Sequence, residues 1–523
     1  MKYNSLSKLS LSAGAAALAA SLLFAGSALP TEAAARGITV ALSSAVTTLD
    51  PYDATDSLSK SVIKSMYEGL FAFDKDLVPQ PQLAESYEVS PDGLVYTFKL
   101  RQGVKFHDGT EFTSEAVKLN IERVLDPANA LHRRTFLNFI DRVEPDGPYT
   151  VRFVLKHPMS AVIARLANGT AQMICPSAIK KEGSKGLAFK ACGTGPYVFK
   201  EFKPGDRLLV EKNPAYRVAG LPKLDSINWL TVPENSTRAS MILTGEADYV
   251  HNLAPELAAR TTADKNVSVF NTPSISERYF SINTSKKPFN DVRVRQALAY
   301  AVNKDAFAKV VFGGYARPAE GVIPSNIPGA KRFGVWPYDP KKARELLKEA
   351  GYPNGFKTEL WSGFNTSTDI KALQFLQQQL RQVGISAEVR PLDAAQCVSL
   401  VDNHEDPATV PVRLLYISWS NSTAEPDWGI RPLFDSREMP PVLGNYSYYS
   451  NPKVDAALDR GMAETDQAKR FAAYGEAQDI IWNEAPAVFL VWVNNIAAAN
   501  KHLKNFHPLV DSTFEFYNAS WEE

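Results

Sequence analysis

Two indoles and two acids in one short stretch offer the clearest ligand-binding chemistry of the chain. The segment WSNSTAEPDW runs from Trp419 to Trp428 and carries hydroxyl and amide side chains between its tryptophans. An acid beside an aromatic ring, as at Asp427, can hold an ammonium group. Asp427 equally fits a turn or a helix N-cap, because a proline precedes it and the run WGIRPLF follows. The stretch is therefore either a loop aimed at a ligand or a solvated turn.

Catalytic patterns are absent from the sequence. It has no G-x-S-x-G elbow, no G-x-x-x-x-G-K-[ST] loop and no G-x-G-x-x-G after a strand. Gly193 and Gly195 make a turn that enters a strand, so no helix N-terminus is available for a phosphate. The seven histidines are scattered, which argues against a metal site, and no cofactor is expected. We expect a binding protein and no enzyme, with an exported hydrolase of peptides or cell-wall fragments as the alternative.

Composition narrows the class of protein. The 523 residues are too many for one hydrophobic core, so two or three domains are expected. Lys+Arg and Asp+Glu both number 57, which gives no support to a nucleic-acid partner. Charged residues make up 22% of the chain, as in an ordinary globular protein.

The N-terminus has the pattern of a signal peptide. Lys2 and Lys8 precede a small, apolar run, and TEAAARG supplies a small-residue cleavage site after Ala35. No cysteine lies near that site, so we expect an exported periplasmic protein without a lipid anchor. Cys175 and Cys192 are close enough in sequence to close a disulfide, which leaves Cys397 unpaired.

Helices and strands alternate along the chain and should position these groups. Alternating patterns predict a strand over 37–44, a hairpin over 94–106 with its turn at Gln102-Gly103, and a strand over 149–158. Helical spacing predicts helices over 113–125, 288–307 and 338–356, the last with Asp339 as cap and Gly351 as its end. The pattern indicates an α/β protein.

Three segments resemble a known family. GTGPY, PFNDVRVRQALAYAVNK and DPKKARELLKEAGY resemble segments of the extracytoplasmic solute-binding proteins for peptides and nickel, the capture subunits of ABC importers. The resemblance implies a two-lobed α/β clamshell with an extra subdomain on the first lobe. It also implies a monomer that delivers its ligand to ABC permease subunits in the inner membrane. The implied segments are a signal peptide (1–35), first lobe (36–72, 191–277 and 483–523), extra subdomain (73–190) and second lobe (278–482).

A closer resemblance is to the glutathione-binding members of that family. TTLDPYDATDSLS, GLPKLDSINW and SISERYFSINTSKKPF carry it, and they imply glutathione or a similar small peptide as ligand. Dipeptide and oligopeptide binders of the family usually place an Asp three residues after the Trp that ends the corresponding strand. Here Ser422 stands at that position, which argues against ordinary peptides. Dipeptides, oligopeptides, an opine-like compound or a complex of nickel or haem remain alternatives, with nickel disfavoured by the scattered histidines.

Glutathione carries two carboxylates and one ammonium, so a site for it needs a cation, preferably arginine, and an acid. Arg134 and Arg278 are the candidate cations, and Arg133 is the rival of Arg134. The other expected ligand contacts are Tyr52, Asp56 and Ser57 in the first lobe and Asn365, Trp419, Ser422 and Asp427 in the second.

Overall fold

The computed structural model describes residues 36–169, 171–404, 406–407 and 409–522. The expected signal peptide, residues 1–35, lies outside them. Within the described ranges no helix is long and apolar enough to cross a membrane. Helices and strands alternate through the chain, and the expected α/β class is confirmed.

One mixed sheet has the strand order β15-β14-β16-β12-β17-β11-β1-β10-β9-β8, with β13 beside β17. At one end of this sheet, β1 lies between two parallel partners, β10 and β11. The expected strand over 37–44 is β1, and its apolar residues are buried. The bounds here are β1 Ile38–Leu42, β8 Tyr197–Lys203, β9 Arg207–Lys212, β10 Ser226–Thr231, β11 Tyr249–His251 and β13 Ala316–Pro318.

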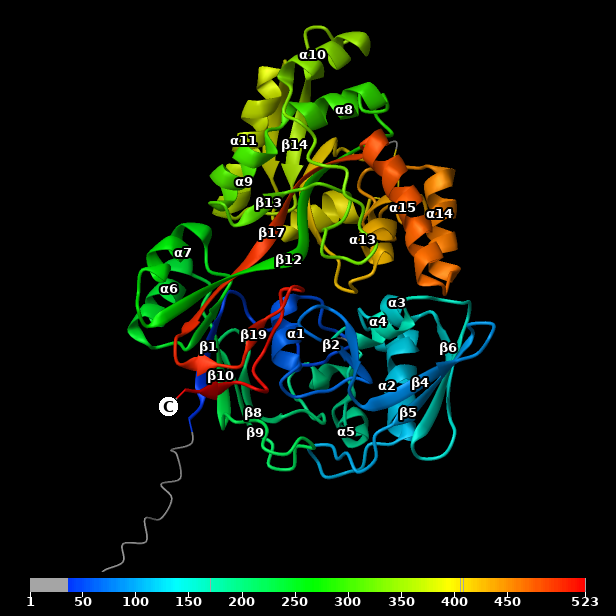
Figure 1. Ribbon diagram of the computed structural model, residues 1–523, viewed down its shortest axis with the longest axis vertical. Coiled ribbons are helices and arrows are strands. Elements are labelled where there is room, and N and C mark those ends of the chain that lie inside the picture. Colours follow the sequence, from blue (N-terminus) through cyan, green and yellow to red (C-terminus); the bar gives the residue numbers. More distant parts are fainter. Residues whose placement is uncertain (1–35, 170, 405, 408, 523) are drawn as a thin grey trace, which may run out of the picture. The chain divides into compact units, whose positions relative to one another are not determined.

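Two long antiparallel strands, β12 (Val267–Ile282) and β17 (Ala487–Asn500), join the two ends of the sheet (Figure 1). Their pairing is regular up to Pro273, shifts before Glu277 and shifts again between Arg278 and Tyr279. Such an irregularity bends a strand locally. The expected lobe boundaries after 277 and 482 fall inside β12 and inside helix α15 (Gln467–Glu484). The division into lobe segments itself stays a prediction.

At the other end, β14 (Phe356–Ser362) lies parallel to both β15 (Ile385–Pro391) and β16 (Leu414–Ser420). Apolar residues of four helices and these strands form one core. The helices are α8 Val292–Ala301, α9 Lys304–Phe312, α10 Pro340–Glu349 and α11 Ser367–Gln382.

Two helix predictions at this end had different outcomes. The helix predicted over 338–356 is α10, and the Asp339 carboxylate accepts a hydrogen bond from the Lys342 N–H at 2.9 Å. The single helix predicted over 288–307 is wrong, because the region forms two helices, α8 and α9. The Asn303 side chain between them accepts from the Ala306 N–H at 2.9 Å and so caps α9.

A separate antiparallel sheet lies within the segment expected to be the extra subdomain. Its order is β4-β5-β7-β6, and helix α2 packs against it. The strand predicted over 149–158 and the helix predicted over 113–125 are confirmed as β7 and α2. The hairpin predicted over 94–106 is wrong, because β5 ends at Leu100 and pairs with β4 and β7. The bounds are β4 Ala84–Val89, β5 Val95–Leu100, β6 Ile140–Pro145, β7 Thr150–Leu155 and α2 Ser114–Leu125.

The remaining elements are shorter or cover the sheets. The helices are α1 Ser57–Ile63, α3 Arg134–Leu137, α4 Val162–Ala167, α5 Pro176–Leu187, α6 Asn235–Thr244, α7 Pro255–Thr262, α12 Ala394–Cys397, α13 Pro426–Phe434 and α14 Pro452–Ala463. The strands are β2 Phe71–Phe73, β3 Pro79–Pro81, β18 Leu503–Lys504, β19 His507–Pro508, β20 Phe514–Glu515 and β21 Ser520–Trp521, and a π-helical turn covers Val398–Asp402. A 3-10 turn covers Pro127–Asn129.

Candidate functional site

The parallel strands β14 and β16 both end at the same edge of the sheet, at Ser362 and Ser420. The neighbouring strand β12 runs the opposite way and enters at this edge, where Ser276 pairs with Ser420. Ligands of open α/β sheets bind outside the carboxyl ends of the strands. This edge therefore brings together the loops after β14 and β16 and the first residues of β12 beyond the register shift.

The loop after β16 and helix α14 both contact the region around α3 and α4. The Asn168 side-chain amide donates to the Ser422 carbonyl at 2.6 Å, and the Ser160 N–H donates to the Met462 carbonyl at 3.0 Å. The Trp428 and Phe136 rings meet edge to face at 5.4 Å. The segment Trp419–Trp428 is thus a packed loop and helix start that meets another part of the chain, and it is no solvated turn.

Trp419 and Trp428 are held against each other. The Trp419 indole N–H donates to the Trp428 carbonyl at 2.7 Å, and the ring centroids lie 5.8 Å apart. The guanidinium of Arg165, on α4, lies 5.7 Å from the Trp428 ring centre. Burial lowers the pKa of Arg165, and the nearby charge of Asp427 opposes that effect. The sequence reasoning missed Arg165, because nothing local distinguishes a buried arginine in an apolar helix.

Asp427 is buried and already bonded within the protein. Its carboxylate accepts from the Arg431 Nε–H at 3.0 Å and from the Tyr474 hydroxyl at 3.1 Å. The residue lies in the first turn of α13, with Pro426 as the first helical residue and Glu425 at the N-cap position. The expected N-cap role is therefore wrong by two residues. Its oxygens orient Arg431 and Tyr474, which makes it a support of the loop in this structure.

Arg278 lies on the face of β12 that meets the loop after β14. Its Nη1 is 3.6 Å from an Asp369 carboxylate oxygen, and its guanidinium is 4.8 Å from the Phe364 ring centre. Its Nε and Nη1 and the buried Tyr416 hydroxyl have no hydrogen-bond partner among the described residues. Asn365 is an exposed residue of the same loop. Arg278 thus forms an ion pair with Asp369 and still has two N–H groups at the sheet edge that lack a hydrogen-bond partner among the described residues.

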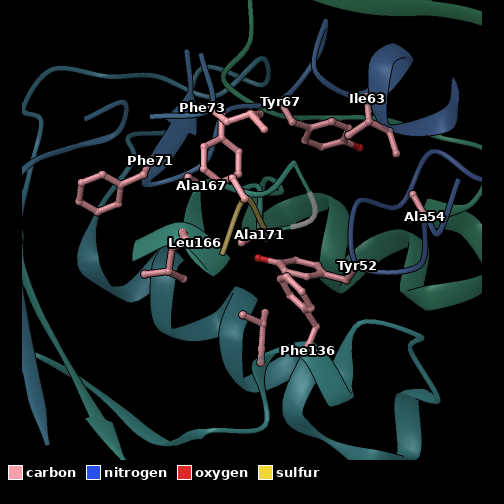
Figure 2. Packing of buried hydrophobic residues seen from close by; sticks show 14 of the residues in the cluster. Tyr52, Ala54, Ile63, Tyr67, Phe71, Phe73, Phe136, Leu166, Ala167 and Ala171 are labelled. Carbon is pink, nitrogen blue, oxygen red and sulfur yellow. The ribbon is translucent and has the colours of Figure 1, made fainter. Parts of the chain in front are cut away.

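The site residues expected in the first lobe differ in what they can offer a ligand. Tyr52 is fully buried beside Phe136, and Figure 2 shows its hydroxyl directed away from the backbone toward Ala171. That hydroxyl has no partner within the described part of the chain. Asp56 caps α1, accepting from the Ser59 N–H at 2.8 Å, and Ser57 is the first residue of that helix.

The two candidate arginines, Arg133 and Arg134, differ in burial. The Arg133 Nε–H donates to the Ala54 carbonyl at 2.9 Å, and burial lowers the pKa of Arg133 to about 10. Arg134 is exposed, and its Nε–H donates to the Leu125 carbonyl at 2.9 Å. The inward residue of the pair, next to the loop that holds Tyr52, is therefore Arg133. A one-residue ambiguity of register in LHRRTF explains why the sequence favoured Arg134.

Cys175 and Cys192 form a disulfide, and Cys397 is a buried free thiol. Where the chain is described, one group of three potential metal ligands lies together, namely Asp108 and these two half-cystines. Sulfur in a disulfide is no thiolate and is a poor metal ligand. This group is therefore not a credible metal centre.

A second residue that sequence reasoning missed is Glu277. It lies on β12 directly before Arg278 and is 2% exposed, and neither carboxylate oxygen has a hydrogen-bond partner among the described residues. Burial raises the pKa of its carboxyl group well above the usual range. The only available signal was an acid beside Arg278 in the strand expected to cross between lobes.

The chain belongs to the bacterial extracellular solute-binding proteins of family 5, whose middle region matches residues 78–441. Members of this family are binding proteins, so the expectation of a protein that is not an enzyme is confirmed. The fold is the two-lobed α/β arrangement of such proteins, as expected.

Curated relatives and solved structures give more specific similarities than the family as a whole. The glutathione-binding protein GsiB of Escherichia coli (strain K12) is 48% identical over 486 residues, covering 93% of this chain and 94% of its own. GsiB of Pectobacterium atrosepticum is 47% identical over 94% of this chain and 95% of its own. Among solved structures, the periplasmic binding protein DppA of Helicobacter pylori, in complex with the peptide STSA, has a TM-score of 0.78 and 27% identity, covering 94% of this chain and 99% of its own.

Proposed function

We propose that this protein is the periplasmic substrate-binding component of an ABC importer. It captures glutathione, or a similar small peptide, between its two lobes and delivers it as a monomer to the permease subunits in the membrane. The observation that carries the proposal is the 48% identity, over 93% of the chain, to proteins named for glutathione binding.

The chemistry of the sheet edge supports a peptide with carboxylates. Arg278 pairs with Asp369 through Nη1, but its Nε–H and Nη1–H lack a hydrogen-bond partner among the described residues, as does the Tyr416 hydroxyl beside it. Charge-assisted hydrogen bonds from arginine to a carboxylate are roughly twice as strong as hydrogen bonds between neutral groups. We therefore assign a glutathione carboxylate to Arg278, with Asn365 as a neighbouring amide contact.

Residues on both sides of the edge complete the proposed site. Trp419 is the next-to-last residue of β16 and Ser422 lies in the loop that follows, which touches Asn168 at the end of α4, and Tyr52 carries a buried hydroxyl in the expected first lobe. Asp56, Ser57 and Asp427 hold local structure that shapes these loops, and Arg133 takes the inward place first expected for Arg134. A ligand touched from both lobes stabilises the closed state, because only that state makes both sets of contacts.

The test is thermal unfolding of the ligand-stripped mature protein with glutathione, oxidised glutathione, dipeptides or a nickel salt. A ligand that binds only the folded state adds RT ln(1 + [L]/Kd), about 2.7 kcal/mol at a hundredfold excess over Kd. A rise in Tm with glutathione, lost in Arg278→Ala, is the expected result. A rise with dipeptides alone would replace glutathione by ordinary peptides as the cargo, and a rise with nickel alone would contradict the proposal.

A further inference from the structure

Glu277 occupies the first paired position of β12 beyond the first of two register shifts between the two long strands. Its side chain is 2% exposed, and both carboxylate oxygens lack a hydrogen-bond partner among the described residues. An ionised carboxylate buried without a partner is among the costliest arrangements in a protein. Its presence at the junction of the lobes therefore needs a physical explanation.

The neighbours of Glu277 form a row of polar groups on one face of the sheet. Glu277 pairs with Trp419 on β16 and with Trp492 on β17, and directly paired residues project to the same face. Asn421 lies two residues beyond Trp419, and its N–H donates to the Ile275 carbonyl at 3.1 Å. The Trp492 Nε1–H and the Asn421 side-chain amide also lack partners among the described residues.

The cations near this row do not neutralise Glu277. Arg278 follows it in the strand, so its side chain lies on the opposite face, against Phe364 and Tyr416. Arg317 is exposed, and its guanidinium lies 5.9 Å from the Trp492 ring centre. Burial raises the pKa of the Glu277 carboxyl group. The carboxylate is thus an acceptor without a donor, flanked by donors without acceptors.

We propose that the Glu277 carboxylate binds the ammonium group of the ligand and so makes capture depend on a free amine. The inference rests on the proposed function, since it assigns the acid that a glutathione site requires. The substrate class is small peptides and amino-acid derivatives with an unblocked ammonium. Asp427, the acid first expected in this role, is already bonded to Arg431 and Tyr474.

The position of Glu277 also links the charge to lobe closure. Ile275, two residues earlier, accepts from Asn421 and donates its N–H to the Val510 carbonyl at 2.9 Å, so the C-terminal segment covers this bend. Without a ligand, the closed state must either hold Glu277 as an unpaired charge or protonate it, and both cost free energy, whereas a ligand ammonium pairs with the charge. Closing without a suitable ligand is therefore disfavoured at this residue.

The experiment compares the affinity of the mature protein for glutathione and for N-acetylglutathione, in which the ammonium becomes a neutral amide. Isothermal titration of the wild type should show about 10²-fold weaker binding of the acetylated compound, the loss typical of one partner of a buried charged pair. Glu277→Gln should weaken glutathione binding by a similar factor and bring the affinity ratio of the two compounds close to one. Glu359→Gln, which changes an acid on β14 that pairs with Arg390, should keep the wild-type ratio.

Each result decides between the two proposals. A wild-type ratio near one, or a Glu277→Gln variant that keeps the wild-type ratio, would overturn the role of Glu277 while leaving glutathione capture intact. If the wild type binds neither compound, the same measurement with a dipeptide and its N-acetyl form applies. Failure of glutathione with a large ratio for the dipeptide would overturn the cargo and retain Glu277. If Glu277→Gln does not fold, Glu277→Asp takes its place: it keeps the charge on a shorter side chain, so it should lower both the affinity for glutathione and the ratio, and an unchanged affinity and ratio would overturn the role of Glu277.

Discussion

At the scale of single residues, the two acids near the sheet edge differ in their hydrogen bonding. Asp427 was the acid singled out by its place between a proline and a tryptophan, and it is bonded to Arg431 and Tyr474. Glu277 lacks any such partner in the described chain. Sequence proximity to an aromatic residue cannot distinguish these cases, because the partners of Asp427 lie four and 47 residues away.

Asp427→Asn should lower the stability of the unliganded protein. The change leaves the buried Arg431 guanidinium with a weaker partner, and breaking a buried ion pair typically costs about 3–5 kcal/mol. We expect a somewhat smaller loss, about 2 kcal/mol, because Arg431 also contacts Asp435 and Asp459. Urea unfolding without ligand measures it, and Glu476→Gln, which breaks an exposed pair with Arg460, is the control at less than about 1 kcal/mol. An unchanged unfolding free energy in Asp427→Asn would return Asp427 to the list of ligand contacts.

At the scale of elements, local signals were sufficient where the chain carried them in full. Asp339 and Pro340 predicted the start of α10, and the helix begins at Pro340 with Asp339 as its N-cap. The boundary between α8 and α9 was missed although Asn303 is a good N-cap residue, because the apolar spacing continues across it. The hairpin prediction failed because β5 ends at Leu100 and pairs with the preceding strand, β4, and with β7, which lies about fifty residues later in the sequence. The residues after Leu100 carry no local signal of that pairing.

Two caps that look alike in sequence should differ in energy. The Asp339 side chain accepts the Lys342 N–H, whereas Thr113 before α2 makes no side-chain capping hydrogen bond. Removing a capping side chain costs about 1 kcal/mol. Asp339→Ala should therefore lower the unfolding free energy by about 1 kcal/mol and Thr113→Ala by only a few tenths, as measured by denaturant unfolding. Equal losses would mean that Thr113 caps α2 in solution.

At the scale of the whole molecule, the sequence was sufficient to predict the fold and the segments at the sheet edge. It was not sufficient to predict which side chains meet there. Family-like segments located the crossing strands and the Trp419–Trp428 loop. Packing between distant segments determines three features that the sequence did not show: Arg133 points inward, Arg165 is buried, and Glu277 has no hydrogen-bond partner among the described residues. The contact between Phe136 and Trp428, for example, joins residues almost three hundred positions apart, and neither segment carries a local pattern that predicts it.

That contact yields a prediction about closure. Trp428 packs on Phe136 and under Arg165, so it stabilises the closed arrangement without having to touch the ligand. When only a fraction of the protein is in the binding-competent state, the apparent Kd rises as that fraction falls. An edge-to-face aromatic pair contributes about 0.5–1.5 kcal/mol beyond its buried area, so Trp428→Ala should weaken glutathione binding about tenfold.

Titration calorimetry measures the affinity of Trp428→Ala, and small-angle scattering should show a larger unliganded radius of gyration than in the wild type. Phe189→Ala, which removes an exposed ring, is the control and should change neither. A Trp428→Ala protein with wild-type affinity and radius would show that these rings do not contribute to closure.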